Sequence, residues 1–107
     1  FICGHNIKGF DNKFIAFHCN YNNIILNKIN IIDTMYITKN YYNNIFLNKN
    51  NKPKRPGLQE LYNYMYNTEI NSLLTHTGKY DVLLTYKIII KFNKILPVEN
   101  YYEEYIF

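Results

Sequence analysis

The alternation of hydrophobic and polar positions along the chain predicts strands and helices in a definite order. Residues 1–4 are a short apolar run that ends at a glycine, which is typical of the end of a buried strand. Residues 11–21 place apolar side chains at helical spacing, and the asparagine-rich run 20–23 ends that helix. The stretch 29–37 is rich in β-branched and aromatic residues, so it predicts a second buried strand.

The second half of the chain predicts two helices. Residues 58–66 carry apolar side chains at spacings of three and four, which indicates an amphipathic helix. Residues 78–93 include the β-branched run 88–90, but their length and period favour a helix. The expected apolar stripes are Leu58, Leu61, Tyr62 and Met65 in the first helix, and Val82, Leu83, Tyr86, Ile89, Ile90 and Phe92 in the second.

The order of strand, helix, strand, helix and helix indicates the α/β class, but two strands do not make a stable sheet. Either the loop and the C-terminal tail supply further strands, or those strands precede residue 1, and we favour the second alternative. Residues 1–94 then form the C-terminal part of one domain, and residues 95–107 form an acidic, aromatic tail. The chain begins with Phe1 and not Met, so we expect it to start inside a longer open reading frame.

The composition bounds the class of protein. Its 107 residues suit one domain, and 48% hydrophobic residues are ample for a core. Asn, Ile, Tyr and Lys make up more than half of the chain, which indicates a coding sequence from an AT-rich genome and lowers the information in each of these residues. No apolar run approaches the roughly 20 residues of a membrane span. Two cysteines make no disulfide framework, so we expect an intracellular, non-secreted protein of the cytoplasm, the nucleus or a viral replication site.

The charge is unevenly distributed. Twelve basic and five acidic residues before position 95 give +7, whereas the last thirteen residues carry three glutamates and no basic residue. The only dense basic cluster lies in the polar segment 40–56 and contains Lys49, Lys52, Lys54 and Arg55. A basic body is compatible with binding a polyanion, and a loop of this kind can contact nucleic-acid phosphates; a solvated loop enriched in lysine by coding bias is the alternative.

Two of the three aspartates fall where helices are expected to begin. Asp11 follows the first strand, and Asp81 lies in the first turns of the last helix, five residues after His76. An aspartate at a helix start often acts only as a cap, worth about 1 kcal/mol. Carboxylates that bind divalent cations beside a histidine with a near-neutral pKa are also the groups that phosphodiester hydrolysis requires. Position alone leaves both interpretations open.

The order and spacing of these motifs resemble the DEDD superfamily of 3′–5′ exonucleases, in its histidine type. His5-Asn6-x-x-x-Phe10-Asp11 resembles the second motif of that family, and His76-x-x-x-x-Asp81 resembles the third. The family also has an Asp-Thr strand between the two, which Asp33-Thr34 resembles, followed by a helix start like residues 57–61. The resemblance covers residues 1 to about 93 and implies a ribonuclease-H-like exonuclease fold, a mixed sheet flanked by helices.

The resemblance implies a role for each matching residue. Asp11 and Asp81 would be catalytic metal ligands, and His76 would be the general base that activates the attacking water. Two Mg²⁺ or Mn²⁺ ions would be the cofactors, and a single-stranded nucleic-acid 3′ end would be the substrate. Asn6 would support the site or contact nucleic acid, together with Lys52, Lys54 and Arg55. A polymerase or replication partner is a further implication, and DNA and RNA remain alternatives as substrate.

One departure from the family is serious. The first motif of the family, Asp-x-Glu, occurs nowhere in these 107 residues. Either the Asp-x-Glu strand lies upstream in a longer exonuclease, or the chain is a catalytically dead nucleic-acid-binding remnant of the same fold. In both cases we expect the chain alone to be inactive. A smaller departure is Gly78 at a position where the family usually has alanine, which costs up to about 1 kcal/mol in helix stability.

Overall fold

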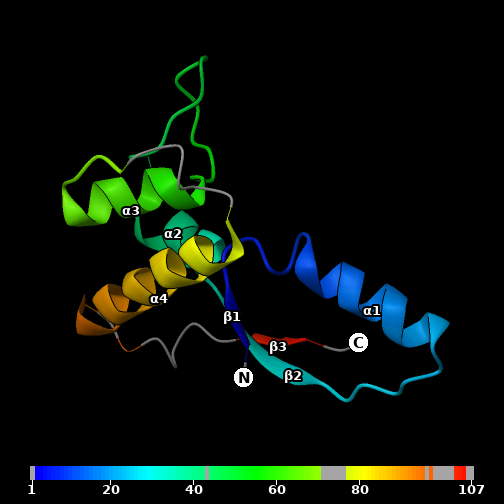
Figure 1. The fold of residues 1–107 in the computed structure, drawn as a ribbon. Helices are drawn as coiled ribbons and strands as arrows, with labels where there is room; N and C mark the ends of the chain where they lie inside the picture. The colour runs from blue at the N-terminus through cyan, green and yellow to red at the C-terminus, as the bar shows by residue number, and fades with distance from the viewer. Residues whose placement is uncertain (1, 43, 71–76, 96, 98–102, 106–107) are drawn as a thin grey trace.

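The protein is a mixed α/β structure in which three helices pack beside a small sheet and a fourth helix projects from it (Figure 1). A computed structural model describes residues 2–42, 44–70, 77–95, 97 and 103–105. Its elements, in chain order, are β1 (Ile2–Gly4), α1 (Asp11–Tyr21), β2 (Ile29–Asp33), α2 (Thr34–Tyr41), α3 (Leu58–Tyr66), α4 (Gly78–Ile95) and β3 (Glu103–Tyr105). No helix in these ranges combines the length and the apolar character needed to cross a membrane.

The sheet has the strand order β1-β2-β3 and contains both parallel and antiparallel pairs. β1 runs parallel to β2 with Cys3 opposite Ile32, and β3 runs antiparallel to β2 with Glu104 opposite Asn30. The C-terminal tail therefore supplies a strand, β3, which is the less favoured of the two alternatives that the sequence leaves open. Ion pairs join this strand to the basic part of the chain, one between Lys8 and Glu103 and one of 3.1 Å between Lys28 and Glu104.

The prediction of a continuous strand over 29–37 is wrong beyond Asp33. The strand ends there because the Asp33 carboxylate accepts a hydrogen bond of 3.1 Å from the Met35 amide and caps α2. Once the helix has begun, the Thr38 hydroxyl donates to the Thr34 carbonyl one turn earlier. Ile37 is buried on this helix, so its apolar character serves the core as a helix residue.

The core lies between β2 and helices α2, α3 and α4. It consists of Ile32, Ile37, Phe46, Leu61, Tyr62, Met65, Leu84, Ile88 and Phe92. The predicted helix 58–66 and its apolar stripe are confirmed, with Leu58 packed partly buried against this core. The predicted helix at 78–93 is also confirmed, and it extends to Ile95.

The predicted stripe of α4 is wrong in all but one member. The buried positions are Leu84, Ile88 and Phe92, at spacings of four residues, whereas Val82 and Tyr86 are largely exposed. Because almost every turn of this helix has an apolar residue on each side, the pattern could not show which side meets α3.

The polar segment before α3 begins later than position 40, since α2 extends to Tyr41. Phe46 anchors its start in the core. Leu47 pairs with Pro53 in an isolated bridge, and the Asn48 side chain accepts from the amides of Asn50 and Lys52. The turn that carries Lys49 and Lys52 is thus closed by an asparagine and extends away from the helices (Figure 1).

Candidate active site

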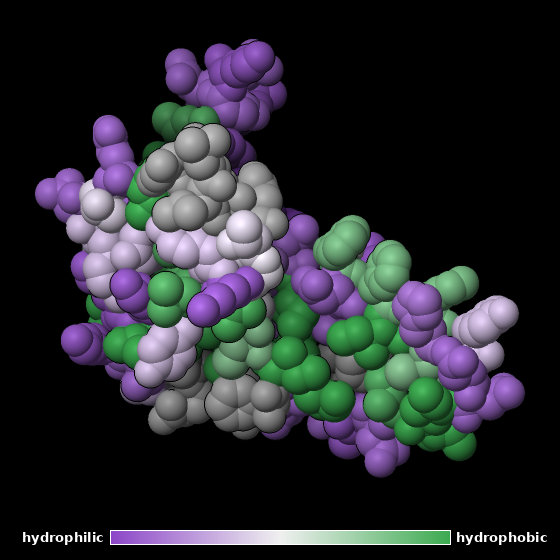
Figure 2. All heavy atoms as spheres, in the orientation of Figure 1, coloured by the Kyte–Doolittle hydropathy of each residue, from purple (hydrophilic) through white to green (hydrophobic). Residues whose placement is uncertain are grey.

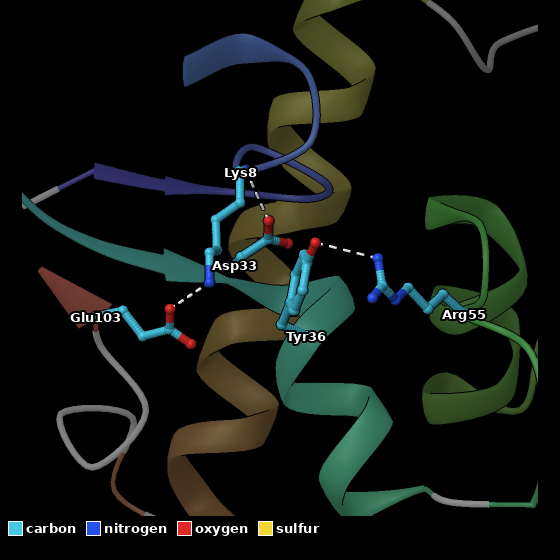
Figure 3. Close-up of polar contacts among 5 residues, drawn as sticks. All are labelled: Lys8, Asp33, Tyr36, Arg55 and Glu103. Atoms are coloured by element: carbon cyan, nitrogen blue, oxygen red, sulfur yellow. Dashed lines mark hydrogen bonds and ion pairs between the residues drawn. The ribbon is translucent and has the colours of Figure 1, made fainter. Parts of the chain in front are cut away.

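The loop between β1 and α1 is held in place by a buried aspartate. Asp33 is 4% exposed, and its two carboxylate oxygens accept from the backbone amides of Asn6 at 2.8 Å and Lys8 at 2.9 Å. The same carboxylate caps α2. It therefore joins the end of β2 to the segment that leads into Asp11 (Figure 3).

His5 braces the other side of this loop. Its Nδ1 lies 2.8 Å from the Thr34 hydroxyl oxygen, and its Nε2 lies 2.9 Å from the Pro56 carbonyl oxygen. Because a carbonyl oxygen only accepts hydrogen bonds, Nε2 is the nitrogen that carries the proton. Burial lowers the pKa of His5 from its ordinary value of 6.5, and the Pro56 carbonyl and the Asp33 charge oppose that shift. His5 is thus a neutral structural bridge at neutral pH.

The lowered pKa of His5 predicts acid destabilisation. In the unfolded chain the imidazole gains a proton as the pH falls through 6.5, while in the folded chain it stays neutral until the pH reaches its lower native pKa. The free energy of unfolding should therefore decrease as the pH falls through 6.5, and level off below the native pKa. Urea unfolding from pH 7.5 to 5 measures this. His5→Gln should remove this part of the dependence and cost about 1–2 kcal/mol at pH 7.5, whereas His18→Gln, on the exposed face of α1, should retain it. An unchanged pH dependence in His5→Gln would contradict the assignment.

Asp11 lies in the first turn of α1 but does not cap it. The N-cap residue is Phe10, and the helix has no side-chain cap hydrogen bond. The capping interpretation, which holds for Asp33, therefore fails for Asp11. An acid in the first turn still interacts favourably with the helix dipole, by about 0.3–1 kcal/mol.

The two aspartates of the predicted site line one pocket. This pocket has a volume of about 670 Å³, and its lining includes Asp11, Asp81, His5, Cys3 and Thr85. Residues 70 positions apart in the chain line the same pocket because α4 packs against β1. Thr85 is fixed on α4 by a 2.8 Å hydrogen bond from its hydroxyl to the Asp81 carbonyl. The structure thus places Asp11 and Asp81 on one concave surface.

A second pocket adjoins the first and places one lysine, Lys54, beside the carboxylates of Glu60 and Asp81. It has a volume of about 660 Å³, is lined by Lys54, Gln59 and Asn63, and shares Leu58 and Asp81 with the first pocket. Lys54 also pairs with Glu60 at 3.0 Å. Asp81 therefore stands between a surface bearing Asp11 and a surface bearing Lys54.

The remaining predicted nucleic-acid contacts do not gather at these pockets. Asn6 adopts a left-handed backbone with φ of 60°, and a side chain at Gly9 would lie 2.3 Å from its Oδ1 atom. Asn6 is thus a turn residue, which favours the supporting role that the sequence left open. Lys52 is exposed on the asparagine-closed turn.

Arg55 is engaged with a tyrosine instead of projecting freely. Its guanidinium lies 4.3 Å from the centre of the Tyr36 ring, and Nη1 donates to the Tyr36 hydroxyl at 3.1 Å. Lys8 approaches the same ring at 4.7 Å, and Figure 3 shows the two cations on opposite sides of it. Such contacts contribute about 0.5–1 kcal/mol each at exposed sites. The group tethers the segment before α3 to α2.

His76, the predicted general base, lies outside the described residues. Within the described ranges, no group of three or more His, Cys, Asp or Glu side chains is arranged to hold a metal ion. The two carboxylates of the first pocket are oxygen donors, and Mg²⁺ in proteins is commonly held by one or two carboxylates together with water and substrate phosphates. The donor chemistry of Asp11 and Asp81 thus fits a magnesium ion.

Sequence reasoning missed the residues that build the loop. The sequence marks His5 and Asp33 only as parts of motifs, and it predicts Tyr36 within a strand. The available signal was Asp33 followed by Thr34, which is a common start of a helix.

Comparison of the chain with models of protein families, with curated proteins and with solved structures found no match.

Proposed function

We propose that this chain is the C-terminal part of a ribonuclease-H-like 3′–5′ exonuclease domain of the histidine type. It contributes two aspartates and a histidine to the hydrolysis of nucleic-acid phosphodiesters, and the Asp-x-Glu motif lies outside these 107 residues. The observation that carries the proposal is the common pocket of Asp11 and Asp81. The two residues belong to separate motifs, and the packing of α4 against β1 brings both to that pocket.

Two further observations support the proposal. Asp11 has no capping hydrogen bond, so its position lacks the commonest structural explanation. The loop before it is fixed by the buried Asp33 and by His5, which holds Asp11 at a defined place beside β1. A scaffold that locks the backbone next to an exposed carboxylate is the arrangement that a preorganised site needs.

Each residue has a stated role in this proposal. Asp11 and Asp81 would hold Mg²⁺ or Mn²⁺, which when bound neutralises phosphate charge and lowers the pKa of water. His76 takes the proton of the attacking water. Lys54, in the adjoining pocket, contacts the backbone of the nucleic acid, and Lys52 and Arg55 add charge further along the same segment. These phosphate contacts confer affinity without sequence preference.

The second candidate is a catalytically dead remnant that binds nucleic acid. The observation that favours it is the absence of Asp-x-Glu from the sequence. The nucleotide sequence upstream of Phe1 discriminates between the two: an in-frame Asp-x-Glu strand supports the enzyme, and a stop codon supports the remnant.

The 107-residue chain alone should not degrade nucleic acid, because it lacks half of the carboxylates of the proposed site. The measurement is trimming of 5′-labelled single-stranded DNA and RNA with Mg²⁺ or Mn²⁺, resolved on a sequencing gel. We expect no shortening above that of a His76→Ala control. Stepwise 3′ shortening that His76→Ala abolishes would contradict the claim that a further motif is required.

A further inference from the structure

Helix α1 presents an aromatic row that the rest of the described chain does not cover. Figure 1 shows the helix projecting away from α2, α3 and α4, and Figure 2 shows apolar residues gathered over it. The row consists of Phe10, Phe14, Phe17 and Tyr21, which are 63%, 58%, 64% and 79% exposed. The ring centroids of Phe10 and Phe14 lie 5.9 Å apart, and those of Phe17 and Tyr21 lie 6.4 Å apart. The His18 ring contacts both pairs, at 5.2 Å from Phe14 and 5.5 Å from Phe17.

Packing within the chain does not account for the stability of this helix. Its only buried residue is Asn12, whose side-chain amide has no hydrogen-bond partner in the described structure. A buried amide without a partner costs about 1–3 kcal/mol. Isolated helices shorter than about 12–15 residues are marginal in water, and α1 has 11 residues. The helix therefore needs a partner that covers its apolar face.

The exposed area is that of a protein interface. A buried aromatic side chain covers about 150–250 Å², so the four rings leave about 500 Å² exposed. Two copies that face each other over this row would therefore bury about 1,000 Å², which is the lower limit for a specific interface. An apolar patch of about 500 Å² is as large as the largest patch of a typical monomer, and such patches are often functional.

We infer that the aromatic row of α1 is the contact between two copies of this chain, with the two helices antiparallel about a two-fold axis. The spacings along the row are four, three and four residues. This order is the same in both directions, so an antiparallel copy places Phe10 against the partner's Tyr21 and Phe14 against the partner's Phe17. A self-complementary surface is what a two-fold interface requires.

The charges on the helix agree with this arrangement. α1 carries one acidic residue, Asp11, and one basic residue, Lys13, so two copies meet without net repulsion although the chain carries +4. In the antiparallel arrangement Asp11, in the first turn of one helix, lies near the partner's His18, in the last turn of the other. The N-terminal end of each helix dipole then faces the C-terminal end of its partner's. The inference goes beyond the proposed function and concerns two copies of this 107-residue chain.

Sedimentation equilibrium of the full chain tests the inference. We expect a mass of about twice 12.9 kDa at micromolar concentrations. The double substitution Phe14→Gln with Phe17→Gln leaves the net charge unchanged, and Gln is a good helix former. It should weaken the dimer about 100-fold or more, because each central ring is expected to contribute a factor of about ten or more to the affinity. Ile95→Gln, a matched change at the exposed end of α4, should leave the dimer unchanged.

Hydrogen exchange gives a second readout that does not require a folded variant. In the wild-type chain, protection of the α1 amides should rise with protein concentration, whereas protection of α3 and α4 amides should be independent of it. A monomer at all concentrations, α1 protection that ignores concentration, or a dimer that survives the double substitution would each overturn the inference. Equal weakening by Ile95→Gln would overturn it as well.

Discussion

Asp33→Ala is expected to destabilise the protein by about 3–5 kcal/mol, a large part of the stability of a domain of this size. The substitution removes an acceptor from three backbone amides, those of Asn6, Lys8 and Met35. The carboxylate is buried, so water replaces it poorly, and the cap of α2 is lost at the same time. Urea unfolding followed by circular dichroism measures the loss.

The control for this prediction is a carboxylate on the surface. Glu104→Gln removes an exposed ion pair of 3.1 Å with Lys28 and should cost less than about 1 kcal/mol. Asp33→Asn is an intermediate case, because it retains one oxygen acceptor and places an amide donor against a backbone donor. If Asp33→Ala proved no more destabilising than Glu104→Gln, Asp33 would not be the anchor of the loop that carries Asp11.

The second large effect is expected on catalysis. If the proposed function holds, in a protein that joins this chain to an upstream Asp-x-Glu strand Asp81→Asn should lower kcat about 1,000-fold or more, and His76→Ala should lower it about 100- to 10,000-fold. Asp11→Asn should act like Asp81→Asn, because the two residues line the same pocket. Single-turnover trimming of a 3′ end measures the chemical step separately from substrate binding.

The matched control is a basic residue away from the carboxylates. Lys52→Ala should raise KM and leave kcat unchanged, because an exposed lysine on the turn only neutralises phosphate charge. The dependence of KM on salt concentration should fall by the amount that about one phosphate contact contributes. Full activity in Asp81→Asn, or a loss of kcat in Lys52→Ala equal to that in Asp81→Asn, would contradict the assigned roles.

The sequence predicted helices well where one face alone is apolar. Residues 58–66 are such a case, and the predicted and observed helices coincide. The sequence pattern predicted the wrong buried face for α4, because that helix carries apolar residues on all sides. It also extended β2 past Asp33, because β-branched residues favour strands on average and the capping carboxylate outweighs that preference locally.

The sequence allowed the residues of the candidate site to be named, but not their arrangement in space. Asp11 and Asp81 could be named from the sequence because rare carboxylates stood near expected helix starts. Their meeting in one pocket depends on the packing of α4 against β1, a contact between distant parts of the chain. The exposure of the α1 aromatic row could not be predicted from the sequence either, since an apolar stripe at helical spacing normally indicates burial.

The central claim is that Asp11 and Asp81 form a divalent cation site on this chain. Titration with Mn²⁺, followed by paramagnetic broadening of backbone amide signals in NMR spectra, tests it directly. We predict broadening of the His5, Asp11 and Thr85 amides that Mg²⁺ reverses, that is lost in Asp11→Asn and Asp81→Asn, and that persists in Glu104→Gln. Broadening centred on Glu103 and Glu104, or broadening at the pocket that neither aspartate substitution changes, would contradict the claim.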